Sequence, residues 1–124
     1  MKELVALFPS QLTEALNIGK NASLSSCDKE IRNVVITGLG GSGIGGKIVS
    51  QLVANDISIP VIINNDYHLP NFVNENTLVI ASSFSGNTEE TLAALSKAQE
   101  KGAEIACITS GGKMLEIAIE NNYN

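Results

Sequence analysis

N-V-V-I-T-G-L-G-G-S-G-I-G-G-K, residues 33–47, is the stretch around which the chain is organised. An apolar run ends in a segment that holds six of the eleven glycines, and helix-spaced apolar residues follow at Ile44, Ile48 and Leu52. The pattern predicts a buried strand, a glycine-rich loop and a helix. Glycine lets the backbone approach a ligand closely, and a helix N-terminus favours an anion. We therefore expect a phosphate site at this loop.

The composition describes a small globular protein. The 124 residues are enough for one domain, and 44% of them are hydrophobic, which provides a modest core. The formal net charge is −5, and no run of Lys or Arg is present. This charge argues against nucleic acid and against an anionic membrane surface as partners. An anionic small ligand must then be held by backbone N–H groups and hydroxyls.

The cysteines and the N-terminal residues bear on where the protein works. Cys27 and Cys107 lie far apart and in no metal-binding pattern, so we expect two reduced thiols, with Cys107 buried in an apolar run. The N-terminal apolar run of five residues is too short for a signal peptide, and no stretch is long enough to span a membrane. The sequence predicts a cytoplasmic protein without a membrane partner.

Apolar runs alternate with helix-spaced segments along the rest of the chain. Residues 1–31 are expected to form a lead-in with a helix near 10–19 packed on the edge of the domain, which covers 32–124. Such alternation predicts parallel strands with helices on both faces, an α/β/α sandwich. The expected strands are 33–37, 59–63, 77–81 and 104–109, the loop is 38–43, and the expected helices are 44–54, one that ends near Gly102 and one after Gly112.

The glycine-rich loop by itself fits two other phosphate-binding motifs. Residues 38–43 match the dinucleotide fingerprint GxGxxG, and Asp66 ends the second strand where a ribose-binding acid would lie in an NAD-dependent oxidoreductase. Residues 41–47 match the nucleotide P-loop, except that Ile48 stands where that motif has the Mg²⁺-binding Ser or Thr. The sequence disfavours the P-loop and leaves the dinucleotide interpretation open as an alternative.

A second loop has the sequence S-F-S-G-N-T and carries hydroxyls at Ser83, Ser85 and Thr88. Hydroxyls can donate to phosphate oxygens, and both loops follow strands of one predicted parallel sheet. We therefore expect the two loops to hold one phosphate at the carboxyl edge of the sheet. The alternative is that one hydroxyl only caps the following helix.

The ionisable side chains near these loops are not expected to catalyse a reaction. Glu89 and Glu90 lie in the first turn of a helix, where the dipole stabilises the ionised form and weakens it as a base. His68, the single histidine, is expected in a surface turn, and Lys47 and Lys113 are expected to be exposed. The sequence therefore names no catalytic residue and no metal ligand.

Four motifs occur in order within residues 30–124: G-L-G-G-S-G-I-G-G (38–46), D-Y-H-L-P (66–70), S-F-S-G-N-T-E-E-T (83–91) and I-T-S-G-G-K-M (108–114). Together they resemble the sugar isomerase (SIS) domain, and more narrowly the bifunctional phosphoglucose/phosphomannose isomerase family. The resemblance implies a parallel sheet of about five strands between helices, of which this chain would supply four. It also implies that the phosphate of a hexose 6-phosphate is held by Ser83, Ser85 and Thr88, with Gly41 and Ser42 close to the sugar.

By the same resemblance, the reaction would interconvert glucose or mannose 6-phosphate with fructose 6-phosphate. A base removes the proton beside the carbonyl and a cis-enediol is reprotonated at the neighbouring carbon, without a metal or another cofactor. The family's base and its ring-opening histidine come from a second SIS domain, so this chain is expected to be C-terminally incomplete and inactive alone, and the full-length protein to be a homodimer. The alternative is a non-catalytic phosphosugar-binding SIS module.

Overall fold

The computed structural model describes residues 1–124 and contains one sheet of four parallel strands. The strands are β1 (Asn33–Thr37), β2 (Val61–Asn64), β3 (Thr77–Ser82) and β4 (Glu104–Ile108), in the order β2-β1-β3-β4. Neighbouring strands are in continuous register, so that Val35 pairs with Ile62 on one side and with Val79 on the other. The predicted parallel α/β fold is confirmed; β1 has the expected bounds, and the bounds of the other strands differ from the expected ones by at most two residues.

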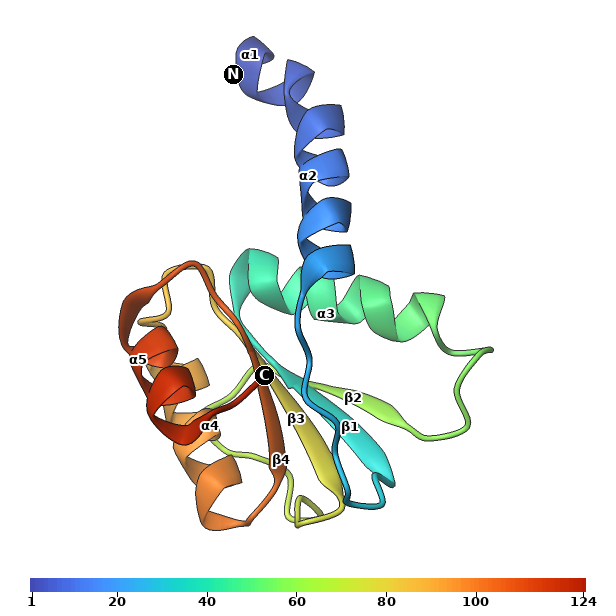
Figure 1. Cartoon of the computed structure of the whole chain (residues 1–124), viewed down its shortest axis with the longest axis vertical. Coiled ribbons are helices and arrows are strands. Elements are labelled where there is room, and N and C mark those ends of the chain that lie inside the picture. Colours follow the sequence, from blue (N-terminus) through green and yellow to red (C-terminus); the bar gives the residue numbers. More distant parts are fainter.

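Helices cover both faces of the sheet, as predicted (Figure 1). On one face lie α4 (Glu89–Glu100) and α5 (Gly112–Asn121), and on the other lies α3 (Gly40–Leu52). The main core lies between the sheet and the first pair, because side chains of a strand alternate between its faces. It contains the fully buried side chains Val35, Val79, Ala94, Leu95, Ala98 and Met114.

The glycine-rich loop is shorter than expected, because α3 begins at Gly40 rather than at residue 44. Only Gly38 and Leu39 separate it from β1. Two of its glycines face the sheet: a Cβ added at Gly46 would lie 2.7 Å from Ile36 Cγ2, and one at Gly43 would lie 2.7 Å from the Gly38 carbonyl oxygen. These glycines therefore serve close packing of the helix on the sheet, which a sequence pattern alone does not distinguish from a flexible loop.

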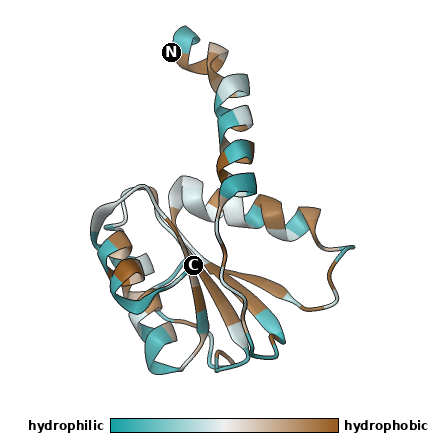
Figure 2. Cartoon of the chain, in the orientation of Figure 1, coloured by the Kyte–Doolittle hydropathy of each residue, from teal (hydrophilic) through white to brown (hydrophobic).

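The helical part of the lead-in buries no residue against the domain, which corrects the expectation. It contains α1 (Lys2–Ala6) and α2 (Phe8–Asn21), neither of which has a buried residue. Both project from the body of the molecule (Figure 1). Brown and teal segments alternate along α2 in Figure 2, which shows that the helix carries apolar as well as polar residues. Its apolar side chains, such as Leu12 and Leu16, are exposed to solvent. No helix of the chain has the length together with the apolar character that crossing a bilayer requires.

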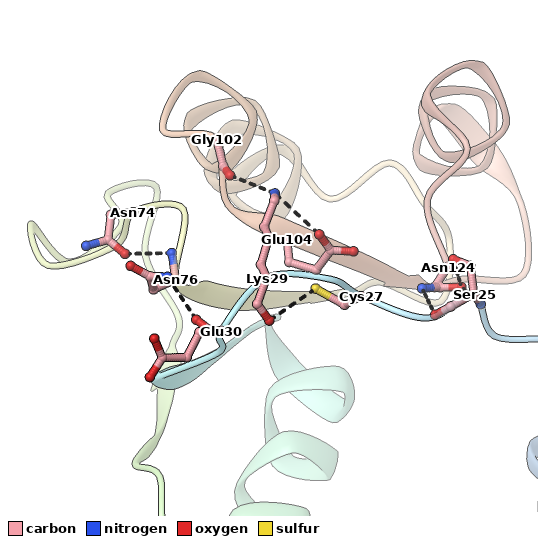
Figure 3. A network of polar contacts seen from close by, with 9 residues as sticks. All are labelled: Ser25, Cys27, Lys29, Glu30, Asn74, Asn76, Gly102, Glu104 and Asn124. Atoms are coloured by element: carbon pink, nitrogen blue, oxygen red, sulfur yellow. Dashed lines mark hydrogen bonds and ion pairs between the residues drawn. The ribbon is translucent and has the colours of Figure 1, made fainter.

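The extended part of the lead-in is fixed to the outer edge of β4 by a polar network (Figure 3). Lys29 Nζ lies 3.3 Å from Glu104 Oε2 and donates to the carbonyl of Gly102 at 3.1 Å. Ser25 N–H donates to Asn124 Oδ1 at 2.6 Å, although the two residues are 99 positions apart in the sequence. The two ends of the body therefore meet at this edge.

The two thiols are free, as predicted, but they differ in exposure. Cys27 is exposed and Cys107 is half-buried, so that Cys107 is less enclosed than expected. Burial raises the pKa of the Cys107 thiol. At pH 8 a smaller fraction of Cys107 is therefore thiolate than in a fully solvated cysteine. Iodoacetamide should modify the exposed Cys27 well before Cys107, in a time course followed by peptide mass spectrometry. Equal rates at both sites would contradict this prediction.

Candidate functional site

The two predicted loops meet at the carboxyl edge of the sheet, because β1 and β3 are neighbours. The last residue of β1, Thr37, pairs with Ala81 near the end of β3. A Cβ added at Gly38 would lie 2.8 Å from the carbonyl oxygen of Ser82 and 3.2 Å from Cβ of Ser42. The turn before α3 therefore packs against the end of β3, and the two segments, residues 38–42 and 82–88, form one rim at this edge.

The N-terminus of α3 presents free backbone donors at this rim. No side chain caps the helix, and the first bond of its ladder runs from the Gly43 N–H to the Leu39 carbonyl at 3.3 Å. The N–H groups of Gly41 and Ser42 precede that bond and lack an acceptor in the helix. Gly41 is exposed, and a Cβ added to it would meet nothing within 4 Å, so the space in front of it is open.

The N-terminus of α4 has the same character. Thr88 is its N-cap residue but makes no capping bond with its side chain, and the helical ladder begins with Leu92 N–H to Thr88 C=O at 2.9 Å. The N–H groups of Glu89 and Glu90 therefore have no acceptor in the helix. This excludes the alternative in which a loop hydroxyl serves only to cap α4. Two uncapped helix N-termini follow two adjacent strands.

The three predicted hydroxyls differ in their surroundings. Ser83 is buried, its Oγ lies 2.8 Å from Oγ1 of Thr88, and it accepts the Gly86 N–H at 3.1 Å. Ser85 is exposed, and its Oγ accepts the Asn87 N–H at 3.2 Å. Because Ser85 is only an acceptor in that bond, its hydroxyl proton is available for a ligand. One proton of the Ser83–Thr88 pair is available for the same reason.

Two hollows adjoin the rim, and both are lined by Ser42 and Ser82. The smaller one, about 260 Å³, is otherwise apolar and lies between α3 and the sheet. The larger one, about 450 Å³, also includes Phe84 and Ile18 of α2. Neither of these two hollows is lined by Ser83, Ser85 or Thr88. Of the five predicted residues, Ser42 alone borders them.

The loop after β4 supports the rim, a role that the sequence analysis does not predict. Its Ser110 N–H donates to the Phe84 carbonyl at 3.1 Å, and the Met114 N–H donates to the Gly86 carbonyl at 2.9 Å. Gly86 has φ +68° and packs directly against Gly111. The motif I-T-S-G-G-K-M (108–114) is the signal that marks this support.

The charged groups nearby lie at the border of the rim. Tyr67 Oη donates to Glu89 Oε2 at 3.4 Å, and local desolvation together with the carboxylates of Glu89 and Glu90 raises the pKa of Tyr67. Lys47 and Lys113 are exposed, as predicted. His68 is exposed and lines a separate hollow with Lys97 and Lys101. The rim itself is therefore built from backbone donors and hydroxyls, a composition that suits a phosphate ester.

A protein-family model for the SIS domain matches residues 29–115. The chain belongs to the SIS domain family. This match covers both rim-forming turns and the loop after β4, and it confirms the resemblance that the four motifs carry.

Several curated relatives of this SIS domain are isomerases. The chain is 51% identical over its whole length to the bifunctional phosphoglucose/phosphomannose isomerase of Caldicellulosiruptor bescii and covers 37% of that protein. It is 50% identical over 88 residues to the enzyme of the same name from Thermoplasma acidophilum, with 71% of this chain and 27% of the relative aligned. A D-glucosamine-6-phosphate 4-epimerase from Sulfolobus acidocaldarius is 42% identical over 96 residues, which are 77% of this chain and 30% of the epimerase. The chain thus spans about a third of the curated relatives it matches.

Solved structures place the fold in the same family. A protein from Salmonella typhimurium LT2 assigned to the phosphosugar isomerases superposes with a TM-score of 0.63 at 32% identity, over 71% of this chain and 28% of that one. Tagatose-6-phosphate ketose/aldose isomerase from Escherichia coli superposes with a TM-score of 0.62 at 21% identity, over 97% of this chain and 33% of the enzyme. The second likeness bears on the fold alone.

Proposed function

We propose that this SIS domain binds the phosphate of a hexose 6-phosphate at its rim, as the N-terminal part of an isomerase that interconverts glucose or mannose 6-phosphate with fructose 6-phosphate. The 51% identity to a bifunctional phosphoglucose/phosphomannose isomerase supports the substrate class. The epimerase relative also acts on a 6-phosphorylated sugar by its name. A phosphorylated sugar is therefore common to the names of relatives with different reactions.

The observation that carries the proposal is the pair of uncapped helix N-termini beside free hydroxyls. In the proposed complex, the amides of Gly41 and Ser42 face the ligand from α3, while the hydroxyls of Ser85 and Thr88 donate from the β3–α4 turn. Each of these groups favours the charged phosphate without requiring an arginine or lysine. The buried Ser83 hydroxyl holds the Thr88 hydroxyl and the Gly86 N–H in place through its hydrogen bonds to both.

We further propose that residues 32–124 bind the sugar phosphate but do not isomerise it alone, and that the base is supplied from outside this chain. Proton transfer beside the carbonyl needs a base within hydrogen-bond reach of the substrate carbon. Glu89 and Glu90 lie in the first turn of α4, at the proposed phosphate end of the ligand, whereas the reacting carbons C1 and C2 of a hexose 6-phosphate lie at the other end of the sugar. Purified 124-residue protein is therefore expected to bind fructose 6-phosphate without converting it.

The same proposal extends to partners and location. Charged sugar phosphates do not cross a bilayer unaided, which supports a cytoplasmic protein. The net charge of −5 supports a small phosphorylated ligand rather than a nucleic acid. A homodimer in the full-length protein is part of the proposal, and the open rim supports it, since a second domain or subunit would close the site.

The test measures binding of fructose 6-phosphate, fructose and NAD to the 124-residue chain by thermal shift and by titration calorimetry. We expect stabilisation by the phosphorylated sugar alone. Gly41→Ala should keep or raise the melting temperature, because its Cβ meets nothing and alanine favours a helix more than glycine does. It should weaken binding about tenfold by blocking close approach. Thr88→Val should weaken binding about tenfold through loss of a donor to an anion.

Ser96→Ala, at an exposed position farther along α4, is the matched control and should bind like the wild type. Equal stabilisation by fructose would show that the phosphate is not recognised. Stabilisation by NAD alone would favour the dinucleotide alternative instead.

A further inference from the structure

The hydroxyl-bearing turn after β3 has an unusual backbone arrangement. Three successive carbonyls, of Phe84, Ser85 and Gly86, accept hydrogen bonds on the side that faces α5. The donors are the Ser110 N–H at 3.1 Å, Asn87 Nδ2 at 3.2 Å and the Met114 N–H at 2.9 Å. The turn is thus held by partners that lie more than twenty residues away and by one side chain of its own.

The fixed carbonyls determine where the amides point. No peptide bond in the chain is cis, so each N–H points away from the carbonyl that precedes it. The N–H groups of Ser85, Gly86 and Asn87 therefore face the hydroxyl side. Two of them donate to Ser83 Oγ and Ser85 Oγ, and the Ser85 N–H has no acceptor in the protein. Successive amides that face the same side favour an anion.

Asn87 is the side chain that joins the two halves of this arrangement. Its Oδ1 accepts the Lys113 N–H in the first turn of α5 at 3.0 Å, while its Nδ2 holds the Ser85 carbonyl. A Cβ added at Gly112 would lie 2.8 Å from this Nδ2, so the space around the amide is fully used. The Asn87 amide thus bonds to the Lys113 N–H with its oxygen and to the Ser85 carbonyl with its nitrogen. A charged or aliphatic side chain cannot supply both a donor and an acceptor in this way.

We propose that Asn87 is a positioning residue, which turns the amides and hydroxyls of the β3–α4 turn toward a bound phosphate by anchoring that turn to α5. The proposal rests on the proposed function, because it names how that phosphate site is kept in shape. Asn87 itself is not required to touch the ligand.

Hydrogen exchange and fructose 6-phosphate binding test the proposal together. Asn87→Ala should speed exchange of the Lys113 N–H at least tenfold and raise the Kd for fructose 6-phosphate about tenfold. Asn87→Asp keeps the acceptor for the Lys113 N–H but loses the donor to Ser85. It should restore protection at Lys113. Asn121→Ala is the matched control, since that exposed amide bonds only within α5, and it should change neither readout.

The outcomes separate the two claims. A wild-type chain that does not bind fructose 6-phosphate would overturn the proposed function. The anchoring role of Asn87 would then be decided by exchange, which needs no ligand. Unchanged protection of Lys113 in Asn87→Ala would overturn the role of Asn87, and so would an unchanged Kd in a chain whose wild type binds.

Discussion

Gly86→Ala is expected to lower the free energy of unfolding by about 3 to 5 kcal/mol, the largest loss that we expect from a glycine-to-alanine substitution at the rim. The residue has φ +68°, and an added Cβ would overlap the Gly111 carbonyl and lie 2.8 Å from Thr109 Oγ1. The left-handed backbone costs about 1 to 2 kcal/mol for a residue with a Cβ, and the overlap adds the rest. Urea unfolding followed by circular dichroism measures the change.

Gly102→Ala separates the two contributions. Gly102 has the same φ of +68°, but an added Cβ would meet nothing within 4 Å. It should therefore lose only the backbone part, about 1 to 2 kcal/mol. Equal losses of stability in Gly86→Ala and Gly102→Ala would mean that the turns after β3 and β4 can accommodate an extra methyl group between them.

Gly46→Val is expected to cost about 3 kcal/mol and to weaken phosphosugar binding as well. Its Cβ would lie 2.7 Å from Ile36 Cγ2 and 3.5 Å from Ile63 Cδ1, so valine forces α3 away from the sheet. Because α3 also carries Gly41 and Ser42, displacement of the helix moves two of the proposed phosphate donors. Chemical unfolding and titration with fructose 6-phosphate measure the two effects.

Gly45→Val is the matched control one residue earlier on the same helix. An added Cβ there meets nothing within 4 Å. Valine has a slightly better helix propensity than glycine, so the stability should stay the same or rise by a few tenths of a kcal/mol, about 0.3. A loss at Gly45 as large as that at Gly46 would show that the helix, not its packing on the sheet, sets the effect.

The sheet could be predicted because its strands are short apolar runs bounded by turn residues. Val34–Ile36 and Leu78–Ala81 have few alternatives to a buried parallel strand. Alternation with helices then set the parallel order and brought the two loops to one edge. The adjacency of Ser42 and Ser82 follows from topology alone, before any side-chain contact is known.

The start of α3 was predicted wrongly for a physical reason. Glycine has a low helix propensity, so Gly40 to Gly43 suggested a loop. Tertiary packing explains two of the helical glycines, because a Cβ at Gly43 would lie 2.7 Å from the Gly38 carbonyl oxygen and one at Gly46 2.7 Å from Ile36 Cγ2. Gly40 and Gly41 have no such neighbour within 4 Å. The lead-in was wrong in the opposite sense: the apolar spacing of α2 predicted a packed helix, yet none of its residues is buried.

The support of the rim could not be predicted from local patterns. Asn87 was part of a recognised motif, but its partner, the Lys113 N–H, lies 26 residues away on another helix. The distinction between Ser83, which is buried, and Ser85, which is exposed, also depends on tertiary contacts. Residue type marks the candidate site, whereas only the fold separates its buried hydroxyl from its exposed one.

The contact between Ser25 and Asn124 makes a circular permutation of residues 25–124 feasible. Ser25 N–H and Oγ both reach Asn124 Oδ1, at 2.6 and 2.9 Å, so residues 25 and 124 adjoin in space. A short Gly/Ser bridge from Asn124 to Ser25 would turn the body into a ring with little strain, and new ends placed in the exposed turn around Asn55 would give a circular permutant with the same rim.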